Sequence, residues 1–564
     1  MIGQAWQPSA PAALDALGSR GPDAQALWRH EDALLGHTRL SVIDLETGAQ
    51  PMLADERRYA IVYNGEIYNF AALRRELEGC GRRFATRSDT EVLLQGYAQW
   101  GAGLVSRLDG MFAFAIWDTR ERVLFAARDR LGIKPLFYST HRGLVVASTL
   151  ASFLKLADFP RELDYEALRD YLAFQTPLAP ATFLRAVRQL PPAHWLEWRS
   201  GALRMEPYWS IPAPSAEAPS LEALDALLAR TVSDQLVADV PLGAFLSGGI
   251  DSSLIVHYMA QAGARPLLTF SVRFPEAEFD ESAAALAVAR RYGTRHEVFD
   301  APRIGPDELT RALGALDQPL ADPAYVPTFE LAALARRQVT VALSGDGGDE
   351  LFGGYARFLD TEARNPDSVA KRILRSLLAR GLAPGALLRR SLAGRELLFY
   401  RRVELGPWPV SRKSLARYLD PQALRAARPE ATLALWRTLA ASFGDRMDSE
   451  ALMRADLWTY LSENCLVKTD RAGMAHGLEV RVPLLGNAVV DFALAQPAAS
   501  HLRPEPKALL RALARAKLPE EVWARPKHGF SVPLRENFKG PWKALCEHAI
   551  SRTGAVAPFL QPEA

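Results

Sequence analysis

Cysteine is scarce in this chain. Among 564 residues only Cys80, Cys465 and Cys546 occur, far apart and without CxxC spacing. A disulfide framework or a cysteine-based zinc site is therefore not expected, and a reducing, cytoplasmic setting is predicted. The sequence also has no apolar run long enough to cross a bilayer, and its first residues do not have the basic and apolar stretches of a signal peptide. No membrane partner is expected.

An excess of either charge is missing as well. Lys and Arg together number 67 and Asp and Glu number 65, which gives a formal net charge of +2. Because this balance provides no bulk attraction to a polyanion, no nucleic-acid partner is expected. Apolar residues make up 49% and charged residues 23%, which is ordinary for a globular protein, and the length favours two domains.

The first part of the chain is predicted to be an α+β domain. The segments 58–70, 110–118 and 122–129 are rich in β-branched and aromatic residues and are bounded by Gly or Asp, which predicts strands. Apolar residues at helical spacing predict helices at 70–79 and 89–100. Strands interleaved with helix pairs favour sheets that are covered by helices.

A linker rich in Pro, Ser and Ala divides the predicted domains 1–215 and 216–564. Beyond it, compact apolar runs are each followed by a Gly-containing loop and a helical stretch. These runs are 240–246, 265–274 and 338–344. The alternation predicts a parallel α/β sheet covered on both faces. Residues 365–445 are rich in Arg and Leu, have no motif that we can assign, and are predicted to form a helical insertion.

The segment LSGGIDSS at 246–253 has the strongest chemical signal, because it follows an apolar strand and precedes a helix. Gly248 and Gly249 allow the backbone to approach a ligand closely, and the helix N-terminus presents unpaired N–H groups to an anion. The loop also has hydroxyl donors, which are Ser247, Ser252 and Ser253. Asp251 suits Mg²⁺ that is shared with phosphate oxygens. Without a GxxxxGK[ST] lysine, this is not the kinase-type phosphate loop.

A second glycine loop, LSGDGGDELFGGY at 343–355, also follows an apolar strand. Its carboxylates are Asp346, Asp349 and Glu350. In open α/β sheets ligands bind outside the carboxyl ends of the strands, so the two loops are predicted to share Mg²⁺ and pyrophosphate between them.

The two loops resemble the pyrophosphate loops of ATP pyrophosphatases, and the whole chain resembles the asparagine synthetase superfamily. The matching blocks include RGPD (20–23), NGEIYNF (64–70), ARDRLGIKPLFY (127–138), LVKTDRAGMAHGLEVRVPLL (466–485) and RPKHGFSVP (525–533). The resemblance implies an α+β sandwich of the N-terminal-nucleophile type, followed by an α/β ATP-pyrophosphatase domain with a parallel sheet and helical additions. It also implies ATP and Mg²⁺ as cofactors, and a homodimer is frequent in the family.

By this resemblance the adenosine part of ATP would contact Leu246, Val272, Ser344 and Gly345. Asp251 and Asp349 would hold Mg²⁺ and pyrophosphate, and Asp346 would act on the acyl-adenylate and the attacking amine. Lys527 would balance the phosphate charge during adenylation, unless it is a surface lysine beside a Pro turn. The residues Lys468, Asp470 and Arg471 belong to a block that lines the same cleft, whereas Glu479 and Arg481 are either functional or a buried ion pair.

Family members that hydrolyse glutamine begin with Met-Cys-Gly, and the cysteine's own α-amino group serves as the base for its thiol. This chain begins Met1-Ile2-Gly3, so we expect no glutaminase activity by that mechanism. The remaining glutamine pocket is present in the sequence as Arg39, Asn64, Gly65, Glu66 and Asp89. It is either a retained scaffold or a site for a regulatory amino acid.

The sequence therefore predicts an ATP-dependent ligase that adenylates a small-molecule or peptide carboxylate and transfers it to ammonia or an amine. The alternatives are an intramolecular cyclase, as in lasso-peptide cyclases and β-lactam synthetases, and a non-catalytic homologue. Two departures from the family pattern, at 317–319 and 483–486, put aspartate in doubt as the acid, because altered charge near the acyl site changes which acid is tolerated.

Overall fold

The computed structural model describes residues 2–215, 220–275, 280–300, 304–363, 420–421, 435–436, 438–439, 448–525, 534–551 and 554. The helical insertion predicted at 365–445 lies almost entirely outside these residues, and so does Lys527. No helix in the described ranges is long and apolar enough to cross a membrane.

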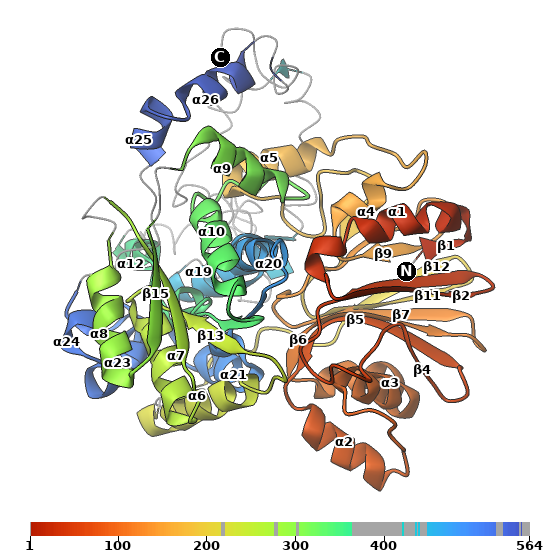
Figure 1. Cartoon of the computed structure of the whole chain (residues 1–564), viewed down its shortest axis with the longest axis horizontal. Helices are drawn as coiled ribbons and strands as arrows, with labels where there is room; N and C mark the ends of the chain where they lie inside the picture. The colour runs from red at the N-terminus through yellow and green to blue at the C-terminus, as the bar shows by residue number, and fades with distance from the viewer. Residues whose placement is uncertain are drawn as a thin grey trace, which may run out of the picture.

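Two six-stranded antiparallel sheets lie face to face in the N-terminal part of the chain (Figure 1). The first has the order β10-β8-β9-β1-β3-β2. Its strands are β1 (Ile2–Gly3), β2 (Ala24–His30), β3 (Ala33–Arg39), β8 (Phe137–Ser139), β9 (Val145–Ala147) and β10 (Arg188–Gln189). The second has the order β12-β11-β7-β6-β5-β4. Its strands are β4 (Met52–Ala54), β5 (Tyr59–Ile67), β6 (Gly110–Asp118), β7 (Val123–Arg128), β11 (His194–Arg199) and β12 (Ala202–Pro207).

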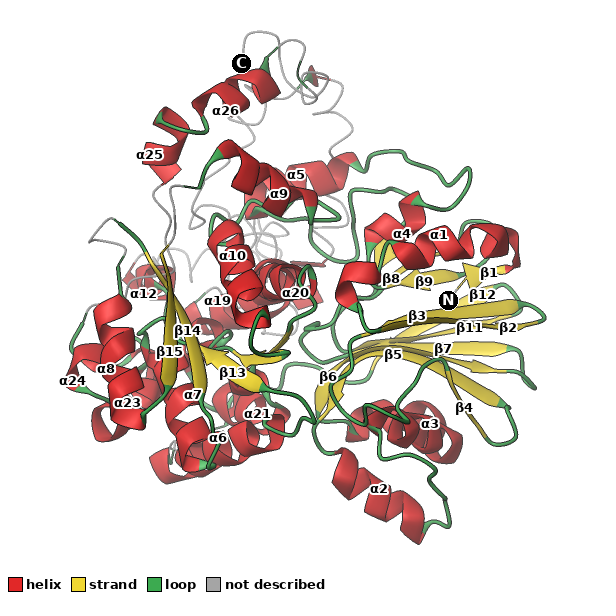
Figure 2. Ribbon diagram, in the orientation of Figure 1, coloured by secondary structure: helices red, strands yellow, loops and turns green. Residues whose placement is uncertain are grey.

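Helices cover the outer face of each sheet, as Figure 2 shows. On the first sheet these are α1 (Ala10–Asp15) and α4 (Leu150–Leu154), and on the second they are α2 (Phe70–Gly79) and α3 (Asp89–Trp100). A further helix, α5 (Tyr165–Phe174), follows. The predicted strands at 58–70, 110–118 and 122–129 and both predicted helices are confirmed, since strong period-2 and helical patterns determine short elements locally.

A five-stranded parallel sheet forms the centre of the C-terminal part, in the order β15-β14-β13-β16-β17. Its strands are β13 (Leu242–Phe245), β14 (Leu268–Arg273), β15 (Arg295–Asp300), β16 (Val341–Leu343) and β17 (Glu479–Arg481). Alternate residues of β16 face opposite ways: Val341 and Leu343 join one hydrophobic core and Ala342 joins another. The predicted parallel sheet with two covered faces is therefore confirmed.

Helices pack on both faces of this sheet, for example α7 on one face and α10 on the other. The helices of the C-terminal part are α6 (Leu221–Gln235), α7 (Ile250–Gln261), α8 (Ser282–Tyr292), α9 (Pro306–Gly314), α10 (Tyr325–Arg336), α11 (Gly348–Phe352), α12 (Ala356–Ala363), α19 (Ser449–Asp456), α20 (Leu466–Met474), α21 (Asn487–Ala495), α22 (Ala498–Leu502), α23 (Ala508–Lys517), α24 (Glu520–Trp523), α25 (Leu534–Lys539) and α26 (Lys543–Ile550). A π-helix at Leu457–Cys465 leads directly into α20. π-Helical turns are rare in proteins, and many of those that do occur lie beside functional sites.

Polar contacts join the N-terminal sandwich to the C-terminal part. Arg20 and Asp470 form a buried ion pair at 2.7 Å. The backbone N–H of Asn487 donates to Asp109 at 3.2 Å, and the Asn487 side chain donates to the carbonyl of Leu108 at 2.9 Å. These groups come from both parts of the chain, so the two parts are in direct contact.

Candidate active site

The first glycine loop connects β13 to α7. Gly248 has a φ of +85°, and a Cβ placed there would lie 2.8 Å from the backbone oxygen of Glu281, so only glycine fits. The hydroxyls of Ser247 and Ser252 lie 3.0 Å apart, and Ser252 Oγ also accepts a hydrogen bond from the Ser247 N–H at 3.2 Å. Ser253 differs, since it is fully buried and does not line the cavity described next.

The second glycine loop, between β16 and α11, packs directly on the first. A Cβ on Gly345 would lie 2.7 Å from the backbone nitrogen of Ser252, and a Cβ on Gly348 would lie 2.6 Å from Cγ of Asp251. Both loops therefore line one cavity of about 380 Å³. The residues of this cavity that the sequence predicted are Leu246, Ser247, Gly248, Gly249, Asp251, Ser252, Val272, Ser344, Gly345, Asp346 and Asp349.

Lys507, at the start of α23, joins the two loops electrostatically. Its ammonium lies 2.6 Å from Asp349 Oδ1 and is also paired with Asp251. Burial alone would lower the pKa of Lys507, but the two carboxylates outweigh it and raise the pKa above its usual value. Two carboxylates that converge on one cation suit the ligand preference of Mg²⁺, although no group of three potential metal ligands occurs in the described part of the chain.

The sequence reasoning missed Lys507. One signal was present: a lysine at a helix N-terminus is electrostatically unfavourable, and such a mismatch indicates a nearby anion. It could not be interpreted without knowing which carboxylates face it, because Asp251 lies 256 positions away.

Asp346 is held by two hydroxyl groups at the edge of the same cavity. Ser344 Oγ donates to Asp346 Oδ2 at 2.7 Å, and Thr469 Oγ1 donates to the same oxygen at 3.0 Å. The neighbouring Lys468 instead pairs with Asp322 at 3.2 Å. Lys468, Thr469 and Asp322 all line the cavity, so part of the predicted 466–485 block is beside the second loop.

Glu350 of the second loop also lines the cavity and is buried. Tyr355 donates a hydrogen bond to it at 2.6 Å, and the Cys465 thiol lies 3.5 Å away. Burial raises the pKa of Glu350, and the negative charge of Asp349 adds to that effect. The Glu350 carboxyl is thus more easily protonated than an exposed glutamate.

Neither departure from the family pattern lies in the cavity lining. The segments 317–319 and 483–486 are both absent from it. Asp317 pairs with Arg471 at 3.1 Å, and a Cβ on Gly486 would lie 2.4 Å from Thr231 Cγ2. Leu485 nevertheless packs against Gly347, which lines the cavity, so the effect of these changes on the choice of acid stays a prediction.

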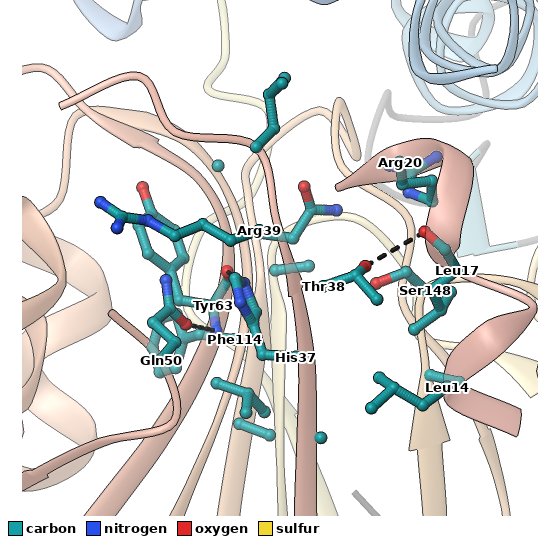
Figure 3. A pocket seen from close by; sticks show the side chains of 18 of the residues that line it. Leu14, Leu17, Arg20, His37, Thr38, Arg39, Gln50, Tyr63, Phe114 and Ser148 are labelled. Carbon is teal, nitrogen blue, oxygen red and sulfur yellow. Dashed lines mark hydrogen bonds between the residues drawn. The ribbon is translucent and has the colours of Figure 1, made fainter. Parts of the chain in front are cut away.

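A second cavity, of about 160 Å³, lies in the N-terminal sandwich, and its lining includes all five residues of the predicted glutamine pocket: Arg39, Asn64, Gly65, Glu66 and Asp89. Figure 3 shows Arg39, Tyr63 and His37 on one side of it and Leu14 and Leu17 on the other. The backbone of Ile2 pairs with Leu34 and Val145, which also line this cavity. Residue 2 therefore lies beside the pocket.

The polar side chains of this pocket are held in place by neighbouring groups. Arg39 donates to the backbone carbonyls of Asp44 at 2.6 Å and Leu45 at 3.0 Å. Asp89 accepts hydrogen bonds from Tyr63 Oη and the Ile67 N–H, both at 3.0 Å. Burial raises the pKa of Asp89 to about 6. An ammonium group would therefore meet an ionised Asp89 only above roughly that pH.

The open question about Glu479 and Arg481 is decided in favour of a buried ion pair. Arg481 Nε donates to Glu479 at 2.8 Å, and its guanidinium also donates to the carbonyls of Gln235 and Val237. Glu66 lies 3.5 Å from the same guanidinium. Burial raises the pKa of Glu66, with the Glu479 charge as a further cause. This cluster links the pocket wall to the parallel sheet.

Comparison with known families matches both parts of the chain. The glutamine amidotransferase domain matches residues 3–209, and asparagine synthase matches residues 223–564. With two interlocked glycine loops on a parallel sheet, these matches define an ATP-dependent C–N ligase that has an amidotransferase-like domain. The chain belongs to the asparagine synthase family.

Relatives in this family are similar along most of their length. Asparagine synthetase (glutamine-hydrolyzing) 1 of Bacillus subtilis (strain 168) is 35% identical over 549 residues, which cover 95% of this chain and 85% of that protein. A putative asparagine synthetase (glutamine-hydrolyzing) of Mycobacterium bovis is 36% identical over 571 residues, with the same shares covered. A solved structure of the allosteric regulatory enzyme of purine biosynthesis covers 60% of this chain and 71% of its own at 16% identity, with a TM-score of 0.28.

Proposed function

We propose that this ligase adenylates a carboxylate with ATP, releases pyrophosphate, and transfers the acyl group to ammonia or an amine without hydrolysing glutamine. The observation that carries the proposal is the convergence of Asp251 and Asp349, from two interlocked loops, on one cation. A site that brings two carboxylates to a shared positive charge at the carboxyl end of a parallel sheet is suited to a metal–pyrophosphate group.

The main predicted residues of the ligase site have the following roles in this scheme. Leu246, Val272, Ser344 and Gly345 would contact the adenosine part of ATP. Asp251 and Asp349 would hold Mg²⁺, which neutralises phosphate charge when it is bound. Asp346 would face the acyl-adenylate and the incoming nitrogen. Lys527, outside the described residues, is proposed to offset the negative charge that adenylation develops.

The nitrogen source is proposed to be free ammonia or an amine. Ile2 has no nucleophilic atom, and the thiol–amine pair that glutamine hydrolysis needs must be on one residue. A single bifunctional substrate that supplies both acid and amine would also fit this chemistry. Since neither departure segment lines the cavity, this cyclase alternative has no specific support from the site.

A pyrophosphate-release assay tests the proposal. Candidate acids are supplied with ATP and Mg²⁺, together with ammonium, glutamine or no amine. We expect acid-dependent release and amide formation with ammonium and no amide with glutamine. Amide formation from one substrate without added amine would favour the cyclase. Absence of pyrophosphate release with every acid tested, in a protein that binds ATP, would contradict both.

Asp251→Ala is the matching variant, and it is expected to lower pyrophosphate release at least about a hundredfold, because the metal–phosphate contact is lost. Asp225→Ala is its control, since Asp225 pairs with Lys517 at 2.9 Å outside the cavity. Equal activity in the two variants would refute the assignment of Asp251.

A further inference from the structure

Thr469 has no role in the scheme above, yet it contacts the proposed reacting carboxylate. It is buried on α20, and Asp346 lies 123 positions earlier in the chain, so only the fold brings them together. Thr469 and Ser344 donate to one oxygen of Asp346, Oδ2. Among the described residues no hydrogen bond to the other oxygen, Oδ1, is present. The two hydroxyls therefore fix the carboxylate and leave Oδ1 for a ligand in the cavity.

Asp346 is oriented by the neutral hydroxyls of Ser344 and Thr469. The nearest cation on the same helix, Lys468, is paired with Asp322, and among the described residues none forms an ion pair with Asp346. Two neutral hydroxyls orient the Asp346 carboxylate by hydrogen bonds without forming an ion pair with it. The successive α20 residues Lys468 and Thr469 thus have different partners. The Lys468 ammonium pairs with Asp322, and the neutral Thr469 hydroxyl donates to Asp346.

We infer that Thr469 is a positioning residue that holds Asp346 to take a proton from the nitrogen that attacks the acyl-adenylate. This inference rests on the proposed function. In the step concerned, the nitrogen lone pair forms the C–N bond, the bond between the acyl carbon and the phosphate oxygen breaks, and AMP leaves with that electron pair. The proton that the nitrogen loses goes to Asp346 Oδ1. No oxidant or further co-reactant is needed.

Adenylation occurs before the nitrogen attacks, so a residue that acts through Asp346 must affect the second step more than the first. Thr469→Val removes the hydroxyl and keeps the branched shape. We expect the rate of amide formation with ammonium to fall about tenfold or more relative to ATP–pyrophosphate exchange, which reports adenylation alone.

Thr469→Ser should restore the rate of amide formation relative to exchange, because the hydroxyl is restored. Thr459→Val is the matched control: Thr459 is buried in the π-helix, donates only to the Ala455 carbonyl at 2.8 Å, and does not line the cavity. Thermal unfolding of all three variants shows whether they fold.

Three outcomes contradict the inference. These are an equal fall in exchange and amide formation in Thr469→Val, no recovery in Thr469→Ser, and an effect of the same size in Thr459→Val. Absence of acid-dependent exchange in the wild-type protein would instead overturn the proposed function and this inference with it. The wild-type measurement therefore separates the two failures.

Discussion

Lys507 stabilises an arrangement that would otherwise place like charges together. Asp251 and Asp349 come from different loops, and their carboxylates share the Lys507 ammonium. The Lys507 backbone has a φ of +60°, a left-handed conformation that costs a lysine roughly 1–2 kcal/mol. The ion pairs offset that cost. A phosphate-bound metal and Lys507 would therefore both act on the same pair of carboxylates.

Lys507→Met is expected to lower the free energy of unfolding by about 3–5 kcal/mol in the absence of metal, because it removes the ammonium from two half-buried carboxylates. Mg²⁺ should then stabilise the variant more than it stabilises the wild-type protein, since binding to the folded state alone raises stability. Thermal unfolding with and without Mg²⁺, in the absence of ATP, measures this difference.

The control for this prediction is Lys517→Met, in the same helix. Lys517 pairs with Asp225, whose side chain is 36% exposed, and it does not line the cavity. Its loss is expected to cost less than about 1 kcal/mol and to cause no dependence on Mg²⁺. An equal response to Mg²⁺ in the wild type and in Lys507→Met would show that the ammonium does not occupy a cation site.

Among the elements, β1 and α20 position residues beside the two cavities. The short strand β1 lies between β3 and β9 in the first sheet, so residue 2 is placed beside the N-terminal pocket by backbone pairing on both sides. Helix α20 serves both cavities, since Thr469 faces the ligase loops while Asp470 pairs with Arg20, which lines the pocket.

Ile2→Cys tests whether the pocket has lost only its nucleophile. After removal of Met1, the variant has a thiol and a free α-amino group on one residue, which is what family glutamine hydrolysis needs. We expect it to release glutamate from glutamine, measured by a coupled assay. Ile2→Ala is the matched control, because it also exposes the amine but has no thiol. If Ile2→Cys released no more glutamate than Ile2→Ala, the pocket would not be a retained glutamine site.

In the whole molecule, buried ion pairs bind the sandwich to the ligase part. Asp470 accepts two hydrogen bonds from Arg20, at 2.7 and 3.0 Å, and Lys134 lies 3.9 Å away. Burial alone would raise the pKa of Asp470, but the charge and hydrogen bonds of Arg20, with Lys134 and Arg471, outweigh it and lower the pKa to about 2. The interface is therefore sensitive to pH.

Asp470→Asn is expected to lower the free energy of unfolding by at least about 2 kcal/mol at pH 7. In the unfolded chain an aspartate has a pKa of about 3.9, so the native state binds fewer protons than the unfolded state between that value and 2. The stabilisation is complete above about pH 4 and is lost as the pH falls towards 2. Denaturant unfolding of the variant and the wild type at several pH values measures the difference.

The matched control is Asp491→Asn. Asp491 pairs with Arg130 across the same interface at 3.1 Å, but its side chain is 51% exposed, so its loss should cost less than about 1 kcal/mol. A destabilisation of Asp470→Asn that stayed constant down to pH 2 would show that the carboxylate charge is not its cause.

The sequence by itself determined the local elements and the nucleotide loops. Alternating β-branched residues and helical spacing act over a few neighbours, so strands such as β5 and helices such as α2 and α3 could be placed to within a few residues. The glycines of both loops were also readable, because a left-handed φ at Gly248 or Gly347 is a property of the local backbone.

The tertiary structure alone decided which distant side chains meet. Lys507 on Asp251, Thr469 on Asp346 and Arg20 on Asp470 are separated by 256, 123 and 450 positions, respectively. No local pattern reports such pairs, because their free energy comes from charges and hydrogen bonds that approach only once the sheets and helices have packed. The same packing placed the altered segments 317–319 and 483–486 outside the cavity lining, with Leu485 packed behind Gly347 of the second loop.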